Sequence, residues 1–203
     1  MQENVLRREK LFELMEDNSA AIIFAGTSKI ATADEYYPFK VNTNFFYLTN
    51  VKQENSVLLL VKGLSEHKTY LFVDEYSELK EKWTGKRLTF DEARQLSDID
   101  SVHSTNDLET FISLALTKDN NQYGAIAKLY LDLTPEIRIK ERYDTIDFSK
   151  SAEEKFPHLK IENVNPFLIQ LRMIKSEYEV ECLRKAIDLT HQGIIHILNN
   201  LKP

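Results

Sequence analysis

Several residue types are scarce in this chain, and each scarcity excludes a class of structure. The only cysteine is Cys182, so no disulfide can form within the chain, which therefore does not depend on an oxidising compartment. No apolar run approaches the ~18 residues of a membrane-spanning helix, and the N-terminus lacks the apolar segment of a secretory signal. We therefore expect a soluble cytoplasmic protein that has no membrane partner.

Sequence motifs for common catalytic and metal sites are also missing. With five glycines, the chain has no Walker loop, dinucleotide fingerprint or G-x-S-x-G elbow, and neither H-E-x-x-H nor C-x-x-C occurs. His191 and His196 would lie roughly 140° apart on a helix, which does not bring them together. Acidic Glu181 beside Cys182 disfavours a reactive thiolate. These observations predict no catalytic residue, no metal ligand and no cofactor in this chain.

Composition indicates one well-packed domain with an appendage. The 203 residues are 42% hydrophobic, and 26 basic and 32 acidic side chains give a net charge of -6. Neither sign is gathered into a long block, so no nucleic-acid partner is expected.

Helical and strand-like segments alternate along most of the chain, which favours an α/β fold with a mixed β-sheet flanked by helices. Two aromatic or apolar runs, Phe45 to Leu48 and Val57 to Val61, predict neighbouring strands joined by the turn-rich segment Asn50 to Ser56. Loop structure is expected from Thr27 to Glu35. The other predicted strands are 19–26, 69–73, 102–103, 128–133 and 160–164, and the other predicted helices are 4–16, 74–82, 90–96, 108–116, 149–156 and 166–172.

Two capping boxes mark helix starts. Thr89 with Glu92 begins the helix at about residue 90, and Ser176 with Glu179 begins a long helix that runs to the end of the chain. One stripe of that long helix is apolar: Val180, Leu183, Ile187, Ile194, Leu198 and Leu201. We therefore divide the chain into residues 1–165, the α/β domain, and 166–203, a linker and one long helix.

Aromatic residues are unusually dense between Tyr36 and Tyr47. Six of the 20 Phe and Tyr residues lie in these dozen positions. A buried core of two strands would explain this density without any chemical role.

A family resemblance gives a second explanation. The string Asp34-x-x-Tyr-Pro-Phe-x-x-Asn-x-x-Phe-x-Tyr-Leu-Thr, the later Trp83-x-Gly-x-Arg87-Leu and the segment Leu171-Arg-Met-Ile-Lys-Ser-Glu-Tyr-Glu-Val180 occur in this order. Together they resemble the N-terminal domain of the aminopeptidase P, prolidase and creatinase family and its bridge to a second domain. The aminopeptidase P branch fits best, and the resemblance covers nearly the whole chain.

Three positions depart from the family pattern. Asn50 replaces a usual glycine, a mild change because asparagine tolerates a left-handed backbone. Asn44 replaces a usual acidic residue and Lys40 a usual arginine, so any ion pair assumed from the family is in doubt at these two positions.

The resemblance implies a function for the parent protein rather than for this chain alone. It implies a creatinase/prolidase-like N-terminal domain in residues 1–165, and in 166–203 the first helix of a pita-bread catalytic domain that is otherwise missing. That missing domain would hold two metal ions, usually manganese, which activate water for cleavage before proline. The implied partners are this catalytic domain, other copies of the chain in a dimer or tetramer, and proline-containing peptides.

Five residues are candidates for the substrate cleft or for subunit contacts: Trp83, Arg87, Tyr36, Tyr37 and Asp34. Trp83 either fills the core or, as the resemblance implies, projects toward a neighbouring subunit's active site. Exposed Tyr36, Tyr37 and Arg87 would close the cleft or contact another subunit, although structural roles stay open. Asp34 would cap or brace its own loop.

Two other functions stay open. The parent protein could be a Xaa-Pro dipeptidase or a creatinase-like hydrolase with the same fold. Alternatively, the chain could be a stand-alone binding or scaffolding module without catalysis.

Overall fold

The fold is taken from a computed structural model that describes residues 3–33, 35–75, 85–118, 123–133 and 144–202. The chain separates into two compact units, Met1–Leu168 and Ile169–Pro203.

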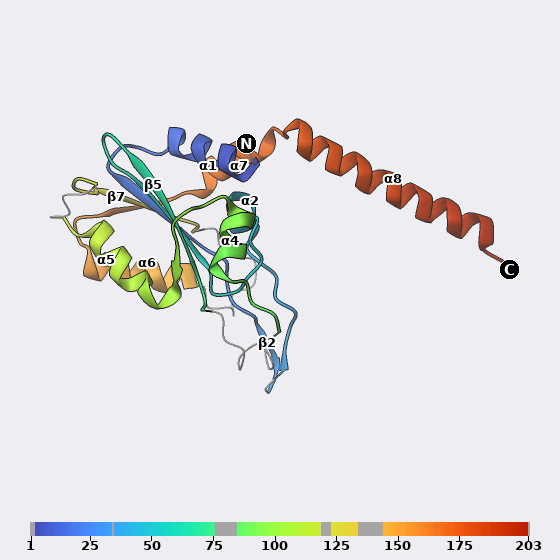
Figure 1. Ribbon diagram of the computed structural model, residues 1–203, viewed down its shortest axis with the longest axis horizontal. Coiled ribbons are helices and arrows are strands. Elements are labelled where there is room, and N and C mark those ends of the chain that lie inside the picture. Colours follow the sequence, from blue (N-terminus) through green and yellow to red (C-terminus); the bar gives the residue numbers. More distant parts are fainter. Residues whose placement is uncertain (1–2, 34, 76–84, 119–122, 134–143, 203) are drawn as a thin grey trace. The chain divides into compact units, whose positions relative to one another are not determined.

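A six-stranded mixed sheet forms the centre of the first unit, in the strand order β6-β5-β4-β1-β7-β8 (Figure 1). β1 and β5 both pair antiparallel with β4, whereas the outer pairs β5–β6, β1–β7 and β7–β8 are parallel. The six strands are β1 (Ser19–Phe24), β4 (Val57–Lys62), β5 (His67–Val73), β6 (Val102–Ser104), β7 (Lys128–Leu131) and β8 (Lys160–Asn163). The predicted mixed sheet flanked by helices is therefore confirmed.

Helices cover both faces of this sheet (Figure 1). The helices of the described residues in the first unit are α1 (Glu3–Leu14), α2 (Thr43–Thr49), α4 (Phe90–Ser97), the 3-10 turn η1 (Thr105–Asp107), α5 (Leu108–Leu116), α6 (Asp144–Lys155) and α7 (Asn165–Met173), the last of which runs into the second unit. Most correspond to predicted helices. The predicted helix 74–82 lies largely outside the described residues.

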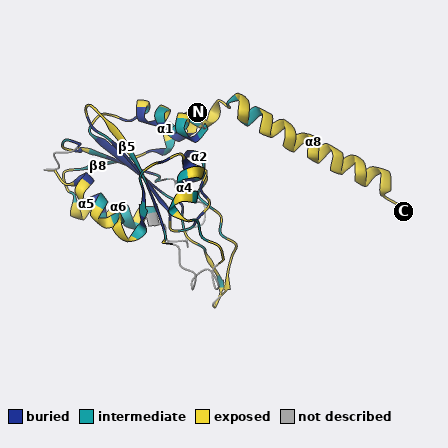
Figure 2. Cartoon of the chain, in the orientation of Figure 1, coloured by how far each residue is buried: buried dark blue, intermediate teal, exposed yellow. Residues whose placement is uncertain are grey.

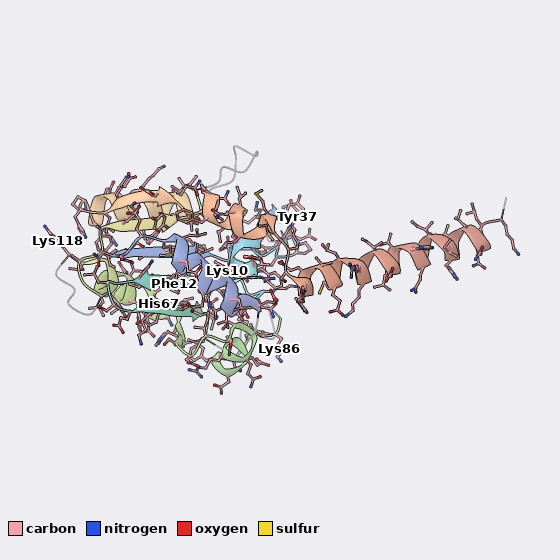
Figure 3. The ribbon with its side chains drawn as sticks, turned by 90° about the horizontal axis from the view of Figure 1, so that it is seen from above. Lys10, Phe12, Tyr37, His67, Lys86 and Lys118 are labelled. Carbon is pink, nitrogen blue, oxygen red and sulfur yellow. The ribbon has the colours of Figure 1, made fainter. Side chains whose placement is uncertain are left out.

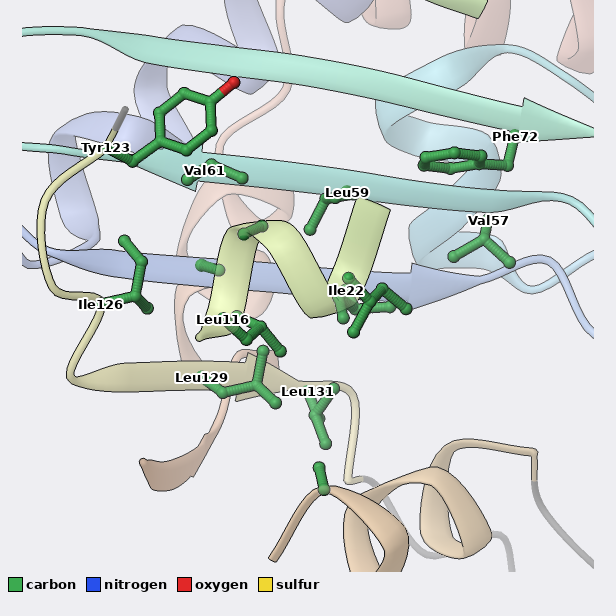
Figure 4. Packing of buried hydrophobic residues seen from close by; sticks show 14 residues of the cluster. Ile22, Val57, Leu59, Val61, Phe72, Leu116, Tyr123, Ile126, Leu129 and Leu131 are labelled. Carbon is green, nitrogen blue, oxygen red and sulfur yellow. The ribbon is translucent and has the colours of Figure 1, made fainter. Parts of the chain in front are cut away.

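Strand alternation explains how one sheet supports two layers of core. On one face, Ile22 and Leu59 belong to a cluster that continues into α5 and α6 through Leu116 and Ala152 (Figure 4). On the other face lie the alternate strand residues, including Tyr130, whose ring contacts Phe167 of α7 at 5.4 Å between centroids. The central strands are buried on both faces, as their continuous apolar sequences require.

The segment Phe45–Leu48 is helical, so the predicted strand there is wrong. Asn42 caps α2, its side-chain oxygen accepting hydrogen bonds from the backbone N–H groups of Asn44 (2.8 Å) and Phe45 (3.1 Å). Asn50 ends the helix in the left-handed conformation, with φ 60°, and this confirms the expectation that asparagine can take the place of glycine. These two caps outweigh the β propensity of the aromatic residues between them.

A small two-stranded ribbon stands apart from the main sheet. β2 (Ile30–Thr32) pairs antiparallel with β3 (Glu35–Tyr36) and projects from the rest of the unit (Figure 1). The predicted loop from Thr27 to Glu35 therefore contains a strand of its own. β2 and β3 have only three and two residues, which is too short for an alternation of apolar and polar residues to be recognised in the sequence.

The second unit consists of the end of α7 and the long helix α8 (Glu177–Asn200). The predicted capping box is confirmed, with Ser176 Oγ accepting from Glu179 N–H at 3.2 Å and Glu179 accepting from Ser176 N–H at 2.9 Å. No α8 residue is buried, and the whole helix is yellow and teal in Figure 2. The apolar stripe on α8 is therefore exposed in this chain.

Candidate functional site

Arg87 lies at the centre of a half-buried network of charged side chains. Its Nη1 donates a hydrogen bond to Asp74 Oδ2, and its Nη2 donates to Glu54 Oε1 at 3.3 Å. The Arg87 side chain is only 11% exposed, and those of Asp74 and Glu54 are 18% and 27% exposed. Of the two roles considered for Arg87, an exposed contact group or a structural residue, its position between two carboxylates fits the structural one.

Asp74 directly follows β5 and receives two further hydrogen bonds. Thr105 Oγ1 donates to Oδ1 at 2.7 Å, and Asn55 Nδ2 donates to Oδ2 at 3.2 Å. Partial burial alone would raise the pKa of Asp74, but the hydrogen bonds from Thr105 and Asn55 and the charge of Arg87 lower it below its usual value. Asp74 is thus an ionised anchor for Arg87 at neutral pH.

Glu54 connects Arg87 to the loop that follows β1. Its Oε2 accepts from both the backbone N–H (3.1 Å) and the hydroxyl (2.6 Å) of Ser28. Arg87 therefore ties together three separate segments: the end of β5, the connection between α2 and β4, and the start of the loop after β1.

A pocket of about 630 Å³ opens beside this network. Its lining comes from the loop after β1, from α2 and the connection that follows it, from the segment before α4, and from α4 itself. The lining residues are Ser28, Phe39, Phe46, Asn50, Lys52, Gln53, Glu54, Lys86, Arg87, Leu88 and Leu96. The size falls within the range of small-ligand sites.

Gln53 is the most buried polar side chain in this lining, at 7% exposed. Its Oε1 accepts a hydrogen bond from Leu88 N–H at 2.7 Å. Its buried Nε2 has no hydrogen-bond partner in the part of the chain that the structure describes. This nitrogen is fully enclosed by protein atoms, so a ligand in the pocket cannot reach it unless the Gln53 side chain moves.

The other candidate residues are not part of this network. Tyr36 and Tyr37 are 58% and 59% exposed and lie at the projecting ribbon. Among the described residues, no hydrogen bond or ring contact links either tyrosine to Arg87. Figure 3 places Tyr37 and Lys86 at the periphery of the first unit. Asp34 and Trp83 lie outside the described residues.

Asn44 contributes a second, fully polar contact near the sheet edge. It is 6% exposed, and its Nδ2 donates to Asp132 Oδ2 at 2.8 Å, just beyond the end of β7. An acidic side chain at position 44 would face Asp132 with like charge, so the amide suits this site. Asn44, which departs from the family pattern, therefore has a matching hydrogen-bond partner in Asp132 of this chain.

The described residues contain no candidate metal site. No group of three or more His, Cys, Asp or Glu residues lies there in an arrangement that could hold a metal ion. Cys182 is a free, exposed thiol on α8. In the same ranges, no helix is both long and apolar enough to span a membrane.

Sequence reasoning found Arg87 but missed its partners. Glu54 and Asp74 are 33 and 13 residues away from it, and Ser28 and Gln53 belong to other segments. The one available signal was an acidic residue directly after a buried strand, at Asp74. Pairing it with Arg87 required the three-dimensional fold.

The fold and the charged network define a helix-covered mixed-sheet domain followed by a long amphipathic helix. A family model described as "Aminopeptidase P, N-terminal domain" matches residues 5–123. The chain belongs to this family.

Relatives and solved structures agree with this assignment. The chain is 32% identical over 181 residues to Xaa-Pro aminopeptidase 3 of Dictyostelium discoideum, covering 89% of this chain and 32% of that protein. It is 27% identical to a Xaa-Pro aminopeptidase of Haemophilus influenzae, covering 97% of this chain and 42% of that one. A structure assigned to aminopeptidase P from Bacillus anthracis superposes with a TM-score of 0.89 at 32% identity, covering 97% of this chain and 46% of that one.

Proline aminopeptidase P II from Yersinia pestis superposes with a TM-score of 0.81 at 26% identity over the whole of this chain and 46% of that one. The chain thus spans less than half the length of these relatives.

Proposed function

We propose that this chain is the non-catalytic N-terminal part of a metal-dependent Xaa-Pro aminopeptidase, which removes the first residue from peptides with proline second. The family match over residues 5–123, together with coverage of 32% and 42% of relatives named as Xaa-Pro aminopeptidases, carries the proposal. In this proposal residues 1–165 form the N-terminal domain, and 166–203 form the linker and first helix of the catalytic domain.

The proposed role of this part is to assemble subunits and to wall the active-site cleft. Exposed tyrosines are common at protein interfaces because they combine a large apolar ring with a polar tip, and Tyr36 and Tyr37 fit that description. Arg87, held by two carboxylates, would position the chain on either side of it. Trp83 and Asp34 are assigned to the same face on the family resemblance alone.

Two partners follow from this proposal. The exposed apolar stripe of α8 would pack against the parent's own C-terminal catalytic domain, and other copies of the chain would contact it in a dimer or tetramer. The two metal ions, manganese or a similar divalent metal, belong in this proposal to the catalytic domain. Because the described residues offer no fitting ligand set, no metal-dependent step is assigned to them.

Cytoplasmic location is part of the proposal. One relative, intermediate cleaving peptidase 55 from Arabidopsis thaliana, is named as mitochondrial. Fractionation of the source cells with an antibody against this chain would decide between the two compartments.

A peptidase assay tests the proposal directly. The 203-residue chain and the full-length product of its gene would each be incubated with Mn²⁺ and either a tripeptide with proline second or a Xaa-Pro dipeptide. We expect no turnover by the chain and cleavage of the tripeptide by the full-length product. Turnover by the chain would contradict its non-catalytic role, and cleavage of the dipeptide alone would assign the parent as a dipeptidase.

A variant of the full-length product tests the cleft and subunit roles. Replacing Tyr36 and Tyr37 with alanine should either lower kcat/KM about fivefold or more, with stability unchanged, or reduce the oligomer size. The control is Leu64→Ala, an exposed apolar side chain (74%) in the turn between β4 and β5. Equal behaviour of the two variants in both assays would remove the tyrosines from the proposal.

If the gene product in source cells has a mass near 23.7 kDa, the chain is a stand-alone binding module instead.

A further inference from the structure

The pocket beside Arg87 carries charges of both signs on one short segment. Lys52 and Glu54 both line it, with Gln53 between them. The Lys52 ammonium lies over the Phe46 ring, 4.9 Å from its centroid, and within the described ranges no carboxylate pairs with it. The other two cations are already matched, since Lys86 pairs with Glu92 at 2.9 Å and Arg87 with two carboxylates.

Glu54 has one oxygen that is well satisfied and one that is not. Oε2 accepts two hydrogen bonds from Ser28, whereas among the described residues Oε1 has only the long 3.3 Å contact from Arg87. A carboxylate has about four acceptor sites, so Oε1 retains capacity for a further donor. A positively charged donor would gain most from it.

An apolar surface lies between these polar groups. Phe39 and Phe46 are half-buried in the pocket lining, which also includes Leu88 and Leu96. Small-ligand sites combine such apolar walls with a few convergent polar groups that fix orientation.

We propose that this pocket binds a free short peptide, of about two residues, that has an apolar side chain. Its α-ammonium group donates to Glu54 Oε1, and its terminal carboxylate pairs with Lys52. The apolar side chain packs on Phe39 and Phe46. This binding does not require the proposed peptidase activity.

Titration of the ¹⁵N-labelled 203-residue chain with leucyl-leucine, followed by ¹H–¹⁵N correlation spectra, tests the site. We expect saturable shifts in the backbone amides of Ser28, Glu54 and Leu88, with a dissociation constant of about 1 mM or tighter. Leucyl-leucine lacks proline, so binding and its failure are both independent of whether the parent cleaves Xaa-Pro bonds.

A capped ligand separates a free peptide from a segment of a polypeptide. N-acetyl-leucyl-leucinamide has the same side chains and peptide carbonyl but neither terminal charge, so we expect its binding to be about tenfold weaker or more. Equal affinity of the two ligands would overturn the assignment of a free peptide. It would indicate a pocket for an internal segment of another protein.

Two variants test whether Lys52 and Glu54 contact the charged ends of the peptide. Lys52→Met should weaken leucyl-leucine binding about threefold or more. It removes an exposed ammonium that has no carboxylate partner among the described residues, so the fold should persist. Lys10→Met, an exposed lysine on α1, is the matched control. Glu54→Gln should also weaken binding, once its spectrum shows a folded chain.

The proposal fails if no saturable shift occurs up to about 10 mM leucyl-leucine. It also fails if Lys52→Met binds as tightly as Lys10→Met, because the carboxylate contact would then be absent.

Discussion

At the scale of single residues, the Arg87 ion pairs explain why separate loops hold one arrangement. A guanidinium offers donors in a rigid fork, and Arg87 uses it to join Asp74 and Glu54, which belong to different segments. Exposed ion pairs contribute little, but this arginine is 11% exposed, so solvent screens its contacts less. The network is therefore expected to contribute measurably to stability.

Replacing Asp74 by asparagine tests this contribution. The variant keeps the shape but removes the charge that Arg87 faces, and we expect about 1–2 kcal/mol of destabilisation at pH 7. Because the pKa of Asp74 is lower in the folded state, the ionised carboxylate stabilises the fold above the unfolded pKa of about 3.9. That stabilisation is lost as the pH falls through the lowered folded pKa. Urea unfolding of wild type and variant between pH 7 and pH 3 should therefore show the difference shrinking with acid.

The matched control is Asp91→Asn. Asp91 also pairs with an arginine, Arg94 at 2.6 Å, but it is 83% exposed, so the expected effect lies within about 0.5 kcal/mol at every pH. If the two variants lost equal stability, or if the Asp74→Asn difference were as large at pH 3 as at pH 7, the ionised contact with Arg87 would not be the cause.

At the scale of elements, α1 gathers the C-terminal ends of two other helices. Arg8 is 4% exposed, and its Nη1 donates to Leu48 O of α2 (2.8 Å) and to Ser97 O of α4 (2.9 Å). Its Nη2 donates to Asp98 O at 3.0 Å, and Asn4 Nδ2 donates to Ser97 O at 2.6 Å. The last carbonyls of a helix lack intrahelical partners and form its negative end, so a cation here satisfies both α2 and α4.

Arg8 remains charged at neutral pH. Burial lowers its pKa to about 10, against the opposing effect of the nearby negative charges of Asp98 and Glu9. We expect Arg8→Met to lose about 3 kcal/mol, because several buried carbonyls then lack a donor. The stability of Arg8→Lys should lie between those of wild type and Arg8→Met, since a single ammonium cannot reproduce the forked set of donors. Chemical denaturation measures both.

The exposed Lys10→Met on the same helix controls for loss of a positive charge on α1 and should change stability by less than about 0.5 kcal/mol. An Arg8→Lys variant as stable as wild type would show that charge alone, rather than the forked geometry, satisfies the carbonyls.

The sequence predicted elements best where one signal acted alone. Thr89 and Ser176 begin capping boxes that the structure contains, and Val57 to Val61 is a strand. At Phe45 two signals disagreed, and the local hydrogen bonds from Asn42 prevailed over aromatic β propensity. A short polar residue directly before an aromatic run, such as Asn42, therefore indicates a helix start more strongly than the aromatic residues indicate a strand.

At the scale of the molecule, alternation of elements predicted the fold class but not the strand order. The central antiparallel strands β1, β4 and β5 are flanked by parallel β6 on one side and β7 and β8 on the other. Runs that are apolar throughout indicate burial on both faces, whatever the direction of the neighbours. Neighbours such as β1 and β7 are separated by about a hundred residues, and no local pattern joins them.

The candidate site, like the strand order, depends on contacts between residues far apart in the sequence. Arg87 stood out in the sequence because of the resemblance, whereas the pocket around it gathers residues from Ser28 to Leu96. Sequence reasoning could propose the residue, but only the fold shows which carboxylates hold it.

The exposed stripe of α8 allows a prediction about the whole chain. Ile187 and Ile194 are 65% and 53% exposed, and no α8 residue is buried (Figure 2). Ending the chain at Lys175 should therefore leave its thermal midpoint within about 3 °C of the longer chain, since the core of the first unit is unchanged. Exposed apolar stripes favour association, so the 203-residue chain should associate with rising concentration and the shortened chain should not.

Sedimentation velocity at several concentrations measures this association, and paired variants identify the face. Ile187→Glu with Ile194→Glu should make the 203-residue chain behave like the shortened one, because charges at both positions oppose burial of the stripe. The control pair, Lys185→Gln with Gln192→Glu, changes the net charge by the same amount on another face of α8 and should leave association intact. If both pairs abolish association, net charge is responsible. If neither does, the contact lies outside this stripe, and the proposed packing of α8 against a catalytic domain loses its physical basis.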